Sequence, residues 1–156
     1  MTTNNASVLL FESDPLLCDL IQLSLEQEGF TVFVQRAARN PLEIVKQLQP
    51  DIILLDLFYP QTQTIDLIKN IHQLPNDPPI EIIVLSALGF REVVQKALDA
   101  GASEYILKPL DISLLILRVK KVHQLRTLQH QQESPRIQKP SFQKPSFQKP
   151  SFRRIR

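Results

Sequence analysis

Cysteine and glycine are scarce in this chain of 156 residues, which contains one cysteine and three glycines. The single cysteine, Cys18, supports neither a disulfide framework nor a zinc site, and it agrees with a reducing compartment. We interpret it as a small buried apolar residue within a helix. The few glycines form no Gly-x-x-x-x-Gly-Lys loop, which excludes that class of phosphate-binding site.

Long apolar runs are also missing. A membrane-spanning helix needs about 18 continuous apolar residues, and no segment approaches that length. Residues 1–6 are polar and uncharged, so we expect no secretory signal. These absences predict a cytoplasmic protein without a transmembrane segment.

Acidic residues are missing from the end of the chain. Residues 134–156 contain seven of the 18 Lys and Arg residues and none of the 16 Asp and Glu residues. The preceding 133 residues therefore hold 11 basic and 16 acidic residues, a net charge of −5 that the overall +2 conceals. The pentapeptide Gln-Lys-Pro-Ser-Phe occurs three times at 138–152, and its regularly spaced prolines exclude a regular helix or central strand. We predict a disordered N-terminus at 1–6, one domain at 7–130 and a basic low-complexity tail at 131–156.

The tail leaves several functions open. Its basic residues alternate with Phe142, Phe147 and Phe152, a pattern that can bind single-stranded nucleic acid through charge and stacking. The same residues could contact an anionic membrane surface or the acidic domain. A solvated tail without a fixed partner is an equal alternative.

Strands and helices are predicted to alternate along the domain. Short apolar runs predict strands at 7–11, 30–35, 51–55, 80–86 and 103–107. Helical patterns extend over 14–29, 40–49, 65–74, 91–100 and from 111 past 129. This alternation predicts an α/β fold, a doubly wound five-stranded parallel sheet with helices on both faces.

Polar residues follow four of the predicted strands at their carboxyl ends. They are Glu12, Asp56, Ser86 and Lys108. In open α/β sheets these ends meet at one edge, where ligands bind. A buried carboxylate such as Asp56 costs stability unless its charge is used, so the pattern predicts a functional site there.

The segments around these residues resemble the receiver domain of two-component response regulators. The matching segments are Leu-Leu-Phe-Glu-Ser-Asp-Pro at 9–15, the stretch 51–60, Ile-Ile-Val-Leu-Ser-Ala at 82–87 and Asp-Ala-Gly-Ala-Ser-Glu-Tyr-Ile-Leu-Lys-Pro at 99–109. They follow the family's order, and the resemblance covers residues 7 to about 130. It implies a flavodoxin-like sheet with the strand order 2-1-3-4-5.

The resemblance implies a role for each matched residue. Asp56 would be the phosphoacceptor, which receives a phosphoryl group from a histidine kinase or a phosphotransfer protein. Lys108 would contact the phosphoryl oxygens, and the Ser86 hydroxyl would donate to one of them. Tyr105 matches the family's aromatic switch residue, although plain packing is an equal interpretation. The peptide bond between Lys108 and Pro109 is usually cis in the family.

The family's Mg²⁺ site is implied at Glu12, Asp56 and the backbone carbonyl of Phe58. The family has two adjacent acids after the first strand, and here Ser13 replaces the second with a neutral hydroxyl. Mg²⁺ prefers charged oxygens in strict geometry, so we expect weak binding to which Ser13 contributes little. Asp14 stands one residue too late and is predicted to cap a helix.

Three further features complete the predictions. The loop 61–64 lacks the glycine that the family usually places there. Glu12 has a simpler interpretation as a solvated acid near a helix start. Residues 123–127 are predicted to form the exposed face of the last helix.

We therefore predict a stand-alone receiver domain that acts as a phosphorylation-controlled protein-interaction switch in a phosphorelay and is not an enzyme. A downstream partner is expected at the face around the fourth helix and the fifth strand. One alternative is a pseudo-receiver that binds partners without phosphorylation. A second is a module that associates with nucleic acid or membranes through the basic tail.

Overall fold

Five strands and five helices alternate along residues 6–133, the part of the chain that the computed structural model describes. The strands are β1 (Ser7–Phe11), β2 (Thr31–Gln35), β3 (Ile52–Asp56), β4 (Glu81–Ser86) and β5 (Glu104–Leu107). The helices are α1 (Pro15–Gln27), α2 (Pro41–Leu48), α3 (Thr64–His72), α4 (Arg91–Ala100) and α5 (Ile112–Glu133). The predicted ends differ from these by at most two residues, which is the usual uncertainty at frayed ends.

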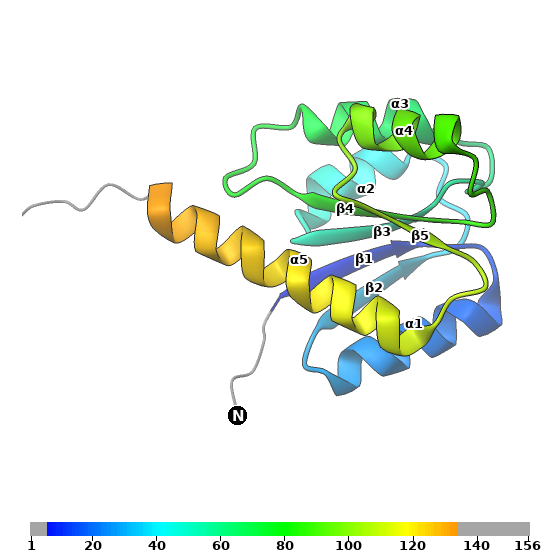
Figure 1. Cartoon of the computed structure of the whole chain (residues 1–156), viewed down its shortest axis with the longest axis horizontal. Helices are drawn as coiled ribbons and strands as arrows, with labels where there is room; N and C mark the ends of the chain where they lie inside the picture. Colours follow the sequence, from blue (N-terminus) through cyan, green and yellow to red (C-terminus); the bar gives the residue numbers. More distant parts are fainter. Residues whose placement is uncertain (1–5, 134–156) are drawn as a thin grey trace, which may run out of the picture.

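The strands form one parallel sheet in the order β2-β1-β3-β4-β5. Helices α1 and α5 cover one face of this sheet, and α2, α3 and α4 cover the other (Figure 1). The predicted doubly wound, flavodoxin-like fold is therefore confirmed.

Alternate residues of each strand enter two separate cores. In β1, Val8 and Leu10 pack toward α1 and α5, whereas Leu9 and Phe11 pack toward the other three helices. Because both faces of the sheet are covered, the central strands are apolar without alternation. In β3, polar chemistry is therefore confined to the strand end, where Asp56 stands.

Arg126 fastens the second half of α5 to the amino end of the sheet. Its guanidinium donates to Asp51 Oδ1 at 2.6 Å and to the carbonyls of Pro78 and Pro79 at 3.1 and 2.9 Å. The other oxygen of Asp51, Oδ2, accepts from the backbone N–H of Ser7 at 2.7 Å. This network ties α5 to the starts of β1 and β3 and to the chain just before β4.

The prediction of an exposed face at 123–127 is confirmed for Gln124, Leu125 and Thr127. It is wrong for Arg126 and for His123, which are half-buried. His123 packs inside the domain. Its ring packs edge-on against Phe30, with 6.0 Å between the ring centroids. Within residues 6–133 its buried Nδ1 has no hydrogen-bond partner, and burial lowers the pKa of the imidazole. The side chain is half-buried because it packs against Phe30.

The ends of the described region extend slightly beyond the predicted domain. Helix α5 continues to Glu133, and its last turns project past the sheet (Figure 1). Ala6, which directly precedes β1, is buried. Residues 1–5 and 134–156 lie outside the described residues, so the predictions for the N-terminus and the tail stay predictions. Between residues 6 and 133, no helix is long and apolar enough to cross a membrane.

Candidate functional site

The structure brings the four predicted polar residues to one edge of the sheet. Glu12 directly follows β1, Asp56 ends β3, Ser86 ends β4 and Lys108 directly follows β5. Asp56 is the register partner of Leu85, which precedes Ser86 on the neighbouring strand. The parallel order of the strands therefore places these side chains at a common carboxyl edge.

Glu12 is buried, with 1% of its surface exposed, and both its oxygens are bound. Oε1 accepts from the backbone N–H groups of Ser13 and Asp14 at 3.0 and 3.1 Å. Oε2 accepts from Lys108 Nζ at 2.7 Å. The interpretation of Glu12 as a solvated acid is therefore wrong, because this carboxylate is held by three donors inside the protein.

Lys108 lies between two carboxylates. Its Nζ is 2.7 Å from Glu12 Oε2 and 3.5 Å from Asp56 Oδ2. Partial burial disfavours the charged ammonium, but the hydrogen bond that Lys108 donates to Glu12 and the charge of Asp56 outweigh it and raise the pKa of Lys108. Asp56 Oδ1 accepts from the backbone N–H of Phe58 at 3.0 Å. The peptide bond from Lys108 to Pro109 is cis, as the resemblance implied.

Leu88 connects Ser86 to Tyr105. Its backbone N–H donates to Ser86 Oγ at 3.1 Å, and its carbonyl accepts from the Tyr105 hydroxyl at 2.6 Å. The fully buried Ser86 hydroxyl accepts this bond and keeps its own proton for donation. Sequence reasoning missed Leu88, because it acts through backbone atoms and leaves no side-chain signal.

The residues implied for Mg²⁺ do not form a tight metal site. Ser13 and Asp14 are exposed, and the Asp14 carboxylate caps α1, as predicted, by accepting from the backbone N–H groups of Leu16 and Leu17. The oxygens of Glu12 are already bound to two amides and an ammonium. Among residues 6–133 no three acidic, histidine or cysteine side chains are grouped to hold a metal. Two carboxylates around an ammonium fit Mg²⁺ poorly.

The loop between β3 and α3 is held by a buried threonine. The Thr64 hydroxyl donates to the carbonyl of Leu57 at 2.7 Å. Gln61 in this loop has φ +53°, the left-handed region that favours glycine, which is the residue type missing from 61–64. A side chain there costs about 1 kcal/mol, so the loop keeps its shape at some expense in stability.

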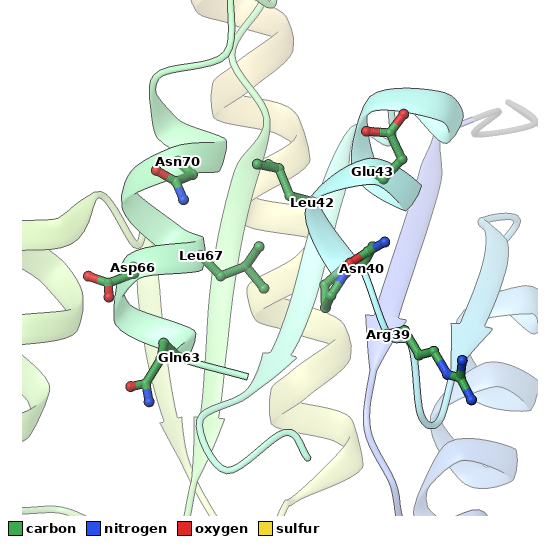
Figure 2. A pocket seen from close by; sticks show the side chains of 9 residues that line it. Arg39, Asn40, Leu42, Glu43, Gln63, Asp66, Leu67 and Asn70 are labelled. Atoms are coloured by element: carbon green, nitrogen blue, oxygen red, sulfur yellow. The ribbon is translucent and has the colours of Figure 1, made fainter. Parts of the chain in front are cut away.

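A groove of about 590 Å³ lies between α2 and α3 (Figure 2). Figure 2 shows Leu42 and Leu67 turned toward the gap between the two helices, whereas Arg39 and Asp66 point away from it. None of the four strand-end residues lines this groove. Its charged groups diverge, so it lacks the convergent chemistry found at the edge of the sheet.

Residues 8–120 match the family model of the response regulator receiver domain. The match covers most of the chain, which therefore belongs to this family. Receiver domains are generally signalling domains rather than enzymes, and they interact with histidine kinases or phosphotransfer proteins. They generally bind Mg²⁺ at the phosphorylation site.

Two of the relatives are transcriptional regulators of greater length. The chain is 29% identical over 113 residues to RpaA of Synechocystis sp., a DNA-binding dual master transcriptional regulator, covering 72% of this chain and 47% of that protein. It is 33% identical over 123 residues to the transcriptional regulatory protein CseB of Streptomyces avermitilis, covering 79% of this chain and 50% of that protein. The chain thus spans about half the length of these curated relatives.

The described fold is also similar to that of an isolated receiver domain whose structure has been solved. The Francisella response regulator 1452 receiver domain superposes with a TM-score of 0.70 at 26% identity, covering 78% of this chain and 98% of that one. The similarity agrees with the fold of the described residues.

Proposed function

We propose that the domain is a phosphorylation-controlled switch in which Asp56 is the phosphoacceptor. An Asp56 oxygen attacks the phosphorus atom of a phosphohistidine, so a P–O bond forms, the P–N bond breaks and the imidazole leaves. Phosphoryl transfer of this kind depends mainly on positioning and on neutralisation of charge. The observation that carries the proposal is the Lys108 ammonium between Asp56 and Glu12, where it neutralises an arriving phosphoryl group.

Glu12 acts here as a positioning residue. Two backbone amides and Lys108 bind its carboxylate, so the acid holds the ammonium beside Asp56 without contacting the donor. With Glu12 committed to Lys108 and Ser13 neutral, we expect weak Mg²⁺ binding and slow transfer.

Ser86 passes the change at Asp56 to the surface. When its hydroxyl turns to donate to a phosphoryl oxygen, the bond from the Leu88 N–H is lost, and Tyr105 is bound to the carbonyl of the same residue. Leu88 also lines a groove of about 540 Å³ between the β3–α3 loop and α4. A downstream protein partner at the α4 and β5 face would therefore respond to phosphorylation.

Incubation of the full chain with acetyl phosphate and Mg²⁺, followed by intact-mass measurement, tests the proposal. We expect wild type to gain one phosphate and Lys108→Met to label much more slowly. Lys96→Met, an exposed lysine on α4, is the matched control and should label like wild type. A wild type that never gains phosphate would instead support a pseudo-receiver, the alternative that the neutral Ser13 favours.

The remaining predictions belong to the same proposal. The donor is a histidine kinase or a phosphotransfer protein in the cytoplasm, and the protein has no enzymatic activity toward a diffusible substrate. The basic tail at 134–156 offers binding to nucleic acid or an anionic surface as a separate function. Deletion of 134–156 tests it, because loss of nucleic-acid or vesicle binding with unchanged labelling would assign that activity to the tail.

A further inference from the structure

Helix α1 turns a row of leucines away from the protein. Leu16, Leu20 and Leu23 are 81%, 47% and 59% exposed and follow one another at helical spacing, i, i+4 and i+7. The buried side of the same helix is formed by other residues, Cys18, Ile21 and Leu25. The row is therefore a second apolar face, opposite the one that packs on the sheet.

Helix α5 also has two apolar faces. Its buried side carries Leu115, Val119 and Val122. A separate row at helical spacing is 41% to 64% exposed and consists of Leu114, Leu117, Leu125 and Leu128. A helix that is apolar on two sides needs a partner on each side. One side of α5 packs on the domain, and the other faces solvent.

These two rows lie on the same side of the molecule. Helices α1 and α5 cover one face of the sheet and contact each other (Figure 1). On the opposite face, the exposed large apolar residues within the described helices are Leu48 and Leu98, both below 40% exposed. A concentration of exposed leucines on one face is a feature of association surfaces.

The charges of the two helices are complementary. The charged side chains of α1 are Asp19 and Glu26, whereas most of those on α5 are basic and include Lys120 and Lys121. At their junction Lys120 already pairs with Glu28, which directly follows α1. No ion pair within residues 6–133 involves Asp19 or Lys121. One leucine row is therefore flanked by acidic side chains and the other by basic side chains. A surface that carries both rows is complementary to the same surface on a second copy.

We propose that this face binds a second copy of the chain. In a two-fold dimer α1 of each copy packs against α5 of the other, so both leucine rows are covered and Asp19 meets Lys121 twice. Arg126 holds the second half of α5 against the body of its own chain, which keeps the leucine row presented outward. The dimer does not depend on phosphorylation of Asp56.

Sedimentation equilibrium of the full chain over a range of concentrations tests this dimer. We expect wild type to approach twice the 17.9 kDa of one chain as its concentration rises. Leu20→Gln and Leu117→Gln should each weaken association by about tenfold, whereas Leu98→Gln on α4 should leave it unchanged. A wild type that stays monomeric up to about 1 mM would overturn the proposal and leave the face to a different helical protein.

A charge exchange identifies which helices meet. Asp19→Lys and Lys121→Glu should each weaken the dimer, because each places like charges together, and the double variant should restore it to within about threefold. If Lys121→Glu alone tightened association, two α5 helices would face each other and the proposal would be wrong. Failure of the double variant to recover, with urea unfolding like wild type, would also overturn it.

Discussion

The two ends of strand β3 carry aspartates that differ in how completely they are bonded. Asp51 precedes the strand and Asp56 ends it, about 16 Å apart in an extended chain. Asp51 accepts from Arg126 at 2.6 Å and from the backbone N–H of Ser7 at 2.7 Å. Asp56 Oδ2 is 3.5 Å from Lys108 Nζ, whose shorter contact, 2.7 Å, is with Glu12.

The difference in bonding distinguishes a structural aspartate, Asp51, from Asp56, the proposed phosphoacceptor. At the amino end, each Asp51 oxygen has a close donor, so the acid and Arg126 stabilise each other. At the carboxyl end, the ammonium is shared unequally and leaves Asp56 Oδ2 with a long contact. A carboxylate that is 7% exposed and has one oxygen with only a long contact is where a new covalent group can be accommodated.

The largest expected effect is on stability at the amino end. Arg126→Met removes three hydrogen bonds and leaves the Asp51 charge poorly compensated, so we expect a loss of about 3 kcal/mol in the free energy of unfolding. Urea unfolding measures it. Lys121→Met, an exposed neighbour on α5, is the control and should change stability by less than about 0.5 kcal/mol at monomeric concentrations. Equal effects would show that the Arg126 network contributes nothing.

At the carboxyl end, Lys108→Met should lower the free energy of unfolding by about 2 kcal/mol, because the buried Glu12 loses its closest donor. The raised pKa of Lys108 determines how the stability that this residue contributes depends on pH. A folded-state pKa above the ordinary 10.5 means that this stabilisation is complete below pH 10.5 and is lost as pH rises through the folded-state pKa. Urea unfolding at pH 8 and pH 11 should therefore show a smaller gap between wild type and variant at pH 11. An unchanged gap would contradict the assigned ion pair.

Ser13→Asp should strengthen Mg²⁺ binding at the carboxyl edge of the sheet. It should not change the fold, because Ser13 is exposed. A second carboxylate beside Glu12 gives Mg²⁺ another charged oxygen, so we expect binding about tenfold tighter and faster labelling by acetyl phosphate. Calorimetry on both proteins measures the binding. Ser13→Asn, a neutral variant, is the control. Tight and equal binding by wild type and Ser13→Asp would show that the site needs no second acid.

The smallest effect concerns His123 near the amino end. Burial lowers its pKa in the folded state below the ordinary 6.5, so the unfolded chain takes up the proton first as pH falls. Wild type should lose stability below about pH 6.5, and His123→Gln should lose less over the same range. Urea unfolding between pH 7.5 and pH 5 measures the difference. Parallel curves for the two proteins would show that His123 titrates normally.

The sequence predicted the alternating strands and helices and the four residues at the carboxyl edge because both depend on local signals, whereas the strand order came only from the resemblance to the receiver family. Apolar runs marked the buried strands, and Asp56 stood out as a charge at the end of one. The cap formed by Asp14 was also predictable, since it needs only its own helix start. These features are short-range or repeat along the chain.

Features that depend on tertiary contacts were not predictable. Glu12 is buried because Lys108, 96 residues away, meets it. His123 is half-buried because its side chain packs against Phe30. Leu88 joins the switch residues through backbone atoms alone. Neither the residue type nor the sequence spacing of Glu12, His123 or Leu88 indicates which residue it contacts.

One measurement tests the distinction between the two aspartates most directly. The intact masses of wild type, Asp51→Asn and Asp56→Asn are compared after equal exposure to acetyl phosphate and Mg²⁺, at a temperature where all three are folded. We expect one added phosphate on wild type and on Asp51→Asn, and none on Asp56→Asn. Phosphate on Asp56→Asn at the wild-type level would contradict the assignment of Asp56 as the phosphoacceptor.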